Sequence, residues 1–123
     1  MFIHESLKVY KLAFALSQKV YQFLKLNSSI PNYLKHQFGR ARLSIQLNIA
    51  EGSGKLSLRD RKNYLVTSRC SVLECASINE LLFAENEIPN HFYHELKEGY
   101  DEISKMLFVM IKELEKKIVK MEQ

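Results

Sequence analysis

Apolar residues recur at three- and four-residue spacing through four long segments of the chain, which predicts four amphipathic helices. Short stretches with proline or glycine, the residues that most often end helices, separate the segments. We predict helices from a Ser6 N-cap to about Leu26, from Asn32 to Glu51, from Ser57 to about Asn86, and from Asn90 to Met121. Long helices with short connections form an antiparallel up-down four-helix bundle, so the predicted fold class is all-α.

The helices differ in the apolar stripes that they are predicted to bury. The first helix has one stripe, formed by Tyr10, Phe14, Ser17, Tyr21 and Leu24. The fourth has a stripe at close to heptad spacing, formed by Leu96, Tyr100, Ile103, Leu107, Met110, Leu114 and Met121. The second helix has a core stripe of Leu34, Phe38, Ala41, Ile45 and Ile49, and an opposed stripe of Leu43, Leu47 and Ala50. Since an isolated bundle needs one buried face per helix, the opposed stripe is a candidate oligomer interface, or the helix buries both faces inside one subunit.

The length of 123 residues, 46% of them apolar, suits a single domain over residues 1–123. The N-terminus lacks a charged region followed by an apolar one, and the longest apolar run, Met106 to Ile111, is too short to cross a bilayer. We therefore expect a cytoplasmic protein without a membrane partner. Cys70 and Cys75 lie about 140° apart on a helix, so we expect reduced, packed thiols rather than a disulfide or a shared metal.

Positive charge is concentrated in the middle of the chain. The net charge is +4, yet residues 35 to 69 contain eight basic and only two acidic side chains, including all five arginines. Such a cluster attracts polyanions, which makes RNA or DNA a candidate partner. The candidate contact residues are Arg40, Arg42, Lys55, Arg59, Arg61 and Lys62. The alternative is a solvated face, or one that pairs with acidic residues of a neighbouring subunit.

The end of the second helix forms a candidate structural motif of Asn48, Glu51, Gly52 and Arg69. Glu51 faces the negative end of the helix dipole, so it needs a cationic partner such as Arg69, Arg59 or Arg61. Gly52 is predicted at the C′ position that stops the helix. Asn48 is expected to hydrogen-bond the backbone or a neighbouring helix.

The segment SIQLNIAEG at Ser44–Gly52 resembles the S-I-P-x-N-I-A-E-G signature of a bacterial four-helix-bundle family, whose members include 23S rRNA intervening-sequence proteins. Shorter similarities occur at Leu7–Tyr10, Ser68–Glu74 and Ile103–Leu107. The resemblance implies a ring-shaped homopentamer related to the accessory protein of diversity-generating retroelements, which binds nucleic acid and engages a reverse transcriptase. Gln46 replaces the usual proline, which implies a straighter second helix in this chain.

Known catalytic patterns are not met by this sequence. Gly52-Ser53-Gly54-Lys55 lacks the first glycine, the Ser or Thr and the preceding strand of a phosphate-binding loop. His91 and His94 have glutamates nearby, but adventitious metal binding is the better interpretation. We therefore expect no catalytic residues, no cofactor and no structural metal. The leading hypothesis is a non-enzymatic ring that binds RNA or DNA, and the alternative is a protein-interaction scaffold with no nucleic-acid role.

Overall fold

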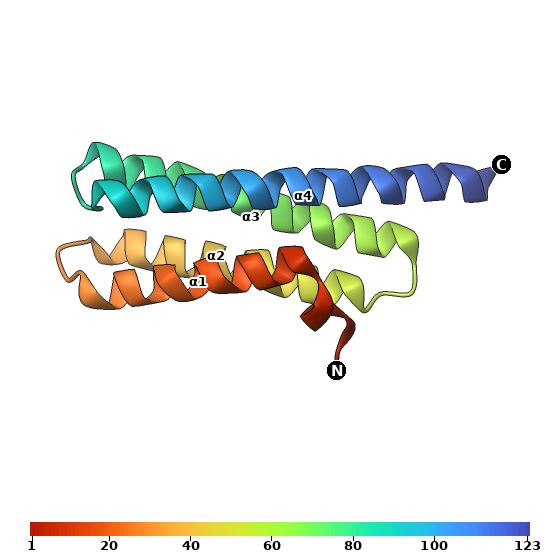
Figure 1. The fold of residues 1–123 in the computed structure, drawn as a ribbon, viewed down its shortest axis with the longest axis horizontal. Coiled ribbons are helices and arrows are strands. Elements are labelled where there is room, and N and C mark those ends of the chain that lie inside the picture. The colour runs from red at the N-terminus through yellow and green to blue at the C-terminus, as the bar shows by residue number, and fades with distance from the viewer.

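The computed structural model describes all 123 residues and contains four α-helices. They are α1 (Lys8–Leu26), α2 (Asn32–Ser53), α3 (Leu58–Ala84) and α4 (Asn90–Glu122), preceded by the short 3-10 helix η1 (Ile3–Ser6). Figure 1 shows α1 and α2 side by side in one layer and α3 and α4 in the other, with α4 extending past the α2–α3 turn. The predicted all-α four-helix bundle is confirmed. The interfaces of α3 with α2 and with α4 are much more extensive than those of α1.

Two predicted helix ends were wrong by one or two residues, whereas α2 begins at Asn32 as predicted. Ser6 lies within η1, where its hydroxyl donates to the Ile3 carbonyl at 2.9 Å, and Leu7 takes the N-cap position of α1. The N-cap of α2 is Pro31, which lacks a backbone N–H and is therefore suited to a helix start. At its other end α2 continues through Gly52 to Ser53.

The predicted start of α3 is confirmed. The side chain of Ser57 accepts a hydrogen bond from the Asp60 backbone N–H at 3.3 Å, which satisfies one of the free donors of the first turn. α3 ends at Ala84, and Asn86 adopts a left-handed backbone conformation with φ of 57°. Asparagine tolerates this conformation better than most residues, so the chain can turn sharply toward α4.

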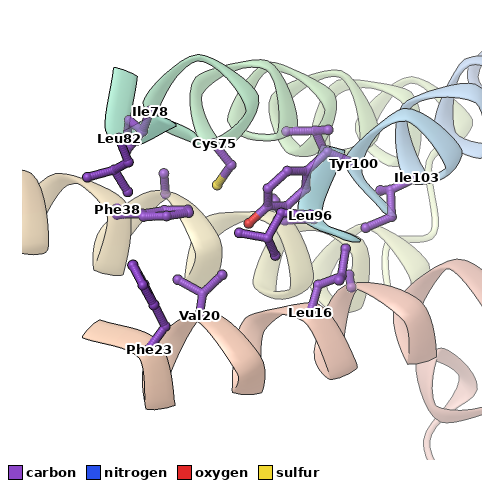
Figure 2. Packing of buried hydrophobic residues seen from close by; sticks show 14 of the residues in the cluster. Leu16, Val20, Phe23, Phe38, Cys75, Ile78, Leu82, Leu96, Tyr100 and Ile103 are labelled. Carbon is purple, nitrogen blue, oxygen red and sulfur yellow. The ribbon is translucent and has the colours of Figure 1, made fainter. Parts of the chain in front are cut away.

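A single hydrophobic core of 24 buried residues runs along the bundle. Figure 2 shows side chains from all four helices entering it, among them Val20 of α1, Phe38 of α2, Leu82 of α3 and Leu96 of α4. The core stripe predicted for α2 is buried at every position. These five residues therefore carry the packing of α2.

The stripe predicted for α1 was partly wrong. Phe14 and Tyr21 are 41% and 47% exposed, although both were expected in the core. A second apolar stripe faces the core in their place, formed by Val9, Ala13, Leu16, Val20 and Phe23. Both stripes have helical spacing, so periodicity alone does not distinguish them. On α4 the predicted core residue Met121 is exposed, because it lies near the end of the helix that extends past the α2–α3 turn.

Small residues of α3 allow a close approach to α2. The Ser68 hydroxyl donates to the Ile45 carbonyl at 2.7 Å, and the Ser71 hydroxyl lies 2.7 Å from the Ser44 hydroxyl. These hydrogen bonds satisfy polar side chains that the interface buries.

None of the four helices is both long and apolar enough to cross a bilayer.

Candidate nucleic-acid interface

The six basic residues proposed from the sequence do not form one patch. Arg40 and Arg42 lie in the middle of α2, whereas the other four surround the turn between α2 and α3. Arg40 is fifteen residues before Lys55, which corresponds to about 22 Å along a helix. We call the end of the bundle that carries η1, the α2–α3 turn and the last turns of α4 the turn end (Figure 1). The structure therefore groups Lys55, Arg59, Arg61 and Lys62 at the turn end and leaves Arg40 apart.

Arg42 packs against α1, so it is a weaker candidate contact for nucleic acid than the cations of the turn end. Its Nη1 donates to the Ser17 hydroxyl at 2.9 Å, and its guanidinium lies 5.2 Å from the centre of the Tyr21 ring. The Nε of Arg42 is buried and has no hydrogen-bond partner. Desolvation by burial lowers the pKa of the Arg42 guanidinium. The residue follows core-facing Ala41, so it points along the α1–α2 seam rather than to solvent.

The turn-end cations are held in different ways. Arg61 Nε donates to the Lys55 carbonyl at 2.6 Å, which ties the start of α3 to the turn. The Lys55 ammonium lies 5.1 Å from the centre of the Tyr64 ring, where a cation–π attraction orients it. Arg59 forms an exposed ion pair with Glu122 of α4. Lys62 has no salt bridge within the chain.

Another lysine of the turn end was missed by sequence reasoning. Lys117 of α4 lines the same cavity as Arg61, although the two residues lie far apart in sequence. The only available signal was its position in the final turns of α4, because antiparallel packing returns that helix to the α2–α3 turn. Lys117 therefore adds to the positive charge of the turn end.

The ion pair expected for Glu51 is absent from the single chain. Glu51 is exposed and has no salt bridge. Arg69, its first proposed partner, instead donates from Nε to the Ser104 carbonyl at 3.3 Å and lies over the Phe108 ring. Since Gly52 faces α3, the preceding Glu51 is turned by about 100° toward solvent.

Two other residues of the predicted motif have structural roles. Asn48 Nδ2 donates to the Ser44 carbonyl at 2.8 Å, which confirms the expected backbone hydrogen bond. Gly52 is buried inside α2 and is not the C′ residue; Gly54 is the C-cap, with a helical φ of −90°. A Cβ on Gly52 would lie 2.9 Å from Tyr64 Cβ. Gly52 is therefore required by the close approach of α2 to α3.

Two separate apolar patches remain on the surface of the chain. The first is on α2, where Leu43 and Leu47 are 39% and 52% exposed and Ala50 is half-buried. This exposure excludes burial of both α2 faces inside one subunit. The second patch lies on α3 and α4, where Val66, Leu73 and Phe108 are exposed around a shallow cavity of about 190 Å³.

The thiols differ from each other in a way that bears on chemistry. Cys75 is buried and free, and burial raises its pKa to about 12, so its thiol is protonated at neutral pH. Cys70 is exposed, so the expectation of a packed thiol was correct for Cys75 and wrong for Cys70.

No group of three or more His, Cys, Asp or Glu side chains is placed to hold a metal ion.

The fold and the charges at the turn end define a small four-helix-bundle protein with one basic end. A family model described as 23S rRNA-intervening sequence protein matches residues 5–109. The chain belongs to this family, as the segment Ser44–Gly52 indicated. The match ends within α4, which continues without a break to Glu122.

A solved structure gives the same fold. A protein with unknown function from the S23 ribosomal protein family of Bacteroides thetaiotaomicron superposes with a TM-score of 0.80 at 24% sequence identity. The superposition covers 85% of this chain and 98% of that chain. At this level of identity the likeness shows the shared fold. No curated protein matches the chain.

Proposed function

We propose that this protein is a non-enzymatic homo-oligomer that binds RNA or DNA through the phosphate backbone at its turn end. The observation that carries the proposal is the grouping of Lys55, Arg59, Arg61 and Lys62 within eight residues around one turn, where Asp60 is the only acid. Lysine and arginine contacts to phosphates supply most of the affinity of sequence-independent binding. The turn end suits this kind of recognition.

The ion pair of Arg59 with Glu122 does not oppose the proposal. Both side chains are exposed, and surface ion pairs contribute only about 0–1 kcal/mol to stability. A phosphate group can replace the Glu122 carboxylate and form a bidentate contact with the guanidinium. Lys62 has no competing salt bridge, so it is available to the same strand.

The family description supports RNA as the first nucleic acid to test. Its printed name, 23S rRNA-intervening sequence protein, places relatives of this chain in the setting of ribosomal RNA. That setting does not itself require a relative to bind RNA. The basic turn end is the independent, physical support for the proposal in this chain.

The two apolar patches support a ring. Leu43 and Leu47 lie on α2, whereas Leu73 and Phe108 lie on α3 and α4, so the two patches are formed by different helices. When one patch of a copy packs on the other patch of the next copy, the contact is heterologous and closes into a ring if the rotation permits. We propose five subunits, as the family resemblance implies. In a ring whose bundle axes run along the symmetry axis, every turn end lies on the same face, which increases avidity for a long polyanion.

The binding proposal is tested by fluorescence anisotropy with labelled single- and double-stranded RNA and DNA at low salt. The double variant Arg59→Gln with Lys62→Gln should bind at least about tenfold more weakly, because two charged hydrogen-bonding groups are lost. Arg40→Gln is the matched control, since Arg40 is exposed on α2 but distant from the turn end. Absence of binding by the natural sequence, or equal losses in the two variants, contradicts the proposal.

The ring is tested separately by size-exclusion chromatography with light scattering. We expect a mass of about five times 14.4 kDa for the natural sequence and dissociation in Leu47→Glu. Leu26→Glu is the control, because Leu26 is exposed at the opposite end of the bundle. A 14.4 kDa monomer at micromolar concentration contradicts the ring. An oligomer that binds no nucleic acid at any salt concentration favours the scaffold function instead.

A further inference from the structure

A cavity of about 310 Å³ opens at the turn end, between the N-terminal segment and helices α2, α3 and α4. Its floor is fully apolar and buried, formed by Ile49 of α2 and Leu65 of α3. Leu7 forms one wall, and Met110 and Leu114 of α4 form the facing wall. Its volume falls at the lower end of the range of about 300–1,000 Å³ that is typical of small-molecule sites.

The charged groups that line this cavity are mainly cationic. Arg61 and Lys117 both line it, and neither has a salt bridge within the chain. Arg61 uses only its Nε on the Lys55 carbonyl, so its terminal nitrogens are available to a ligand. Glu113 is the one acidic lining residue, and its carboxylate lies 3.9 Å from Lys116 Nζ. The cavity therefore combines an apolar interior with two cations that form no salt bridge within the chain and one carboxylate.

We propose that this cavity binds an unbranched aliphatic carboxylate of medium length, with the chain against Ile49 and Leu65 and the carboxylate between Arg61 and Lys117. The lining is aliphatic and contains no aromatic side chain. A nucleobase would need an aromatic partner on which to stack, so the lining disfavours it. Arginine and lysine together provide charge-assisted hydrogen bonds to a carboxylate.

One side of the site lies outside the part of the chain that the family model matches. Met110, Glu113, Leu114 and Lys117 form one side of the cavity, and all four lie beyond residue 109, where the family match ends. The proposal does not depend on nucleic-acid binding. Of the proposed nucleic-acid contacts, only Arg61 also lines the cavity, whereas Lys55, Arg59 and Lys62 do not.

Isothermal titration calorimetry with hexanoate, octanoate, decanoate and dodecanoate tests the proposal on the full chain. Each added methylene that enters the cavity should tighten binding about fourfold, because burial of one methylene contributes about RT ln 4. The gain should stop once the chain fills the hollow. Decylamine, which has the same length and the opposite charge, should bind at least tenfold more weakly than decanoate. Equal affinity of the two, or no binding of any carboxylate, overturns the proposal.

Variants locate the site. Lys117→Gln should weaken decanoate binding about tenfold, whereas Lys116→Gln, its neighbour outside the cavity, should leave it unchanged. Leu114→Trp should abolish binding by filling the hollow, and circular dichroism checks that this half-buried position tolerates the change. Because Lys117 is exposed, its variant remains informative if Leu114→Trp does not fold. Equal affinity of the Lys117 and Lys116 variants overturns the proposal. If light scattering shows that Leu114→Trp breaks the oligomer, and the natural sequence binds no decanoate, then a second copy of the chain occupies the cavity instead.

Discussion

The two ends of the bundle are built from the same four helices but differ in how they use their side chains. At the loop end, which carries the α1–α2 and α3–α4 connections, Ile30 and Ile88 are buried to 2% and 6% exposure. Glu87 accepts a hydrogen bond from the Ser29 hydroxyl at 3.0 Å, which joins the two connections. At the turn end, Leu56 is 96% exposed, a cavity enters the core, and Arg61, Lys62 and Lys117 have no ion-pair partner.

This difference indicates a division between stability and recognition. Satisfied polar groups and buried loop residues at one end hold the helices together. Unpaired cations and an open cavity at the other end contribute little to folding, which agrees with the ligand-binding roles that we propose for this end. Mutations at the loop end should therefore change stability, and charge mutations at the turn end should change binding.

The largest expected effect compares two loop residues. Ile30→Ala should lower the free energy of unfolding by about 2–5 kcal/mol, because it leaves a cavity in the core. Leu56→Ala should change it by less than about 0.5 kcal/mol, since the side chain is already in water. Guanidinium unfolding followed by circular dichroism measures both values. Equal losses would remove the distinction between the two ends.

The next effect concerns two glycines of α2. Gly52→Ala should destabilise the protein by about 1–3 kcal/mol, because the added Cβ meets Tyr64 Cβ at 2.9 Å and forces α2 and α3 apart. Gly39→Ala should stabilise it by about 0.5–1 kcal/mol, because no atom lies within 4 Å of the added Cβ and alanine favours the helix. Thermal unfolding distinguishes the opposite signs. A stabilised Gly52→Ala variant would show that the close approach is not needed.

High pH should lower the free energy of unfolding of the whole bundle, because it ionises side chains in the core that the two ends share. Burial raises the pKa of Cys75 from 9.0 to about 12. The contribution of the protonated thiol to the stability of the folded state is therefore complete below pH 9 and is lost as the pH rises toward 12. Between these values the free energy of unfolding should fall by about 1.4 kcal/mol per pH unit from this thiol. Tyr100, whose pKa is also raised by burial, adds to the loss above pH 10.

Cys75→Ala serves as the control for this pH dependence. The variant also loses packing contacts in the core, so the slopes are compared rather than the absolute values. Denaturant unfolding at pH 8 and pH 10.5 should give a shallower decrease for the variant. The same decrease in both proteins would show that Cys75 does not titrate with the raised pKa.

The smallest expected effect concerns an ion pair between α1 and α4. Lys19 pairs with Glu95 toward the loop end, and Lys19→Gln should lower the free energy of unfolding by about 0.2–1 kcal/mol. Lys62→Gln at the turn end removes no ion pair, so we expect it to leave the free energy of unfolding unchanged. A double-mutant cycle with Glu95→Gln isolates the pairwise contribution. A coupling energy of zero would show that this ion pair does not stabilise the protein, and that the loop end is stabilised by its apolar residues alone.

Much of the fold was predictable from periodicity, but the orientation of each helix was less so. The core stripe of α2 was identified in full, but periodicity did not exclude burial of the opposed stripe of Leu43, Leu47 and Ala50. In α1, aromatic residues such as Phe14 and Tyr21 formed an equally regular stripe that the tertiary packing left exposed. The resemblance of Ser44–Gly52 identified the family, which the family match then confirmed.

The candidate site was only partly predictable. Charge density along the sequence located Lys55, Arg59, Arg61 and Lys62 correctly at one turn, since neighbours in a turn stay together. The packing of Arg42 on Ser17 and Tyr21 was not predictable, because composition does not show which cation lies against a neighbouring helix. Lys117 was missed because its proximity to Arg61 depends on the register of α4 against α3, which local spacing does not encode.

The most direct test of the account is the salt dependence of RNA binding by the natural sequence and by Arg59→Gln with Lys62→Gln. Each phosphate contact to a single strand contributes about 0.7 to the slope of log affinity against log salt concentration. The double variant should therefore lower the slope by about 1.4 for each engaged subunit, while Arg40→Gln leaves it unchanged. Identical slopes in all three proteins would contradict the assignment of nucleic-acid binding to the turn end.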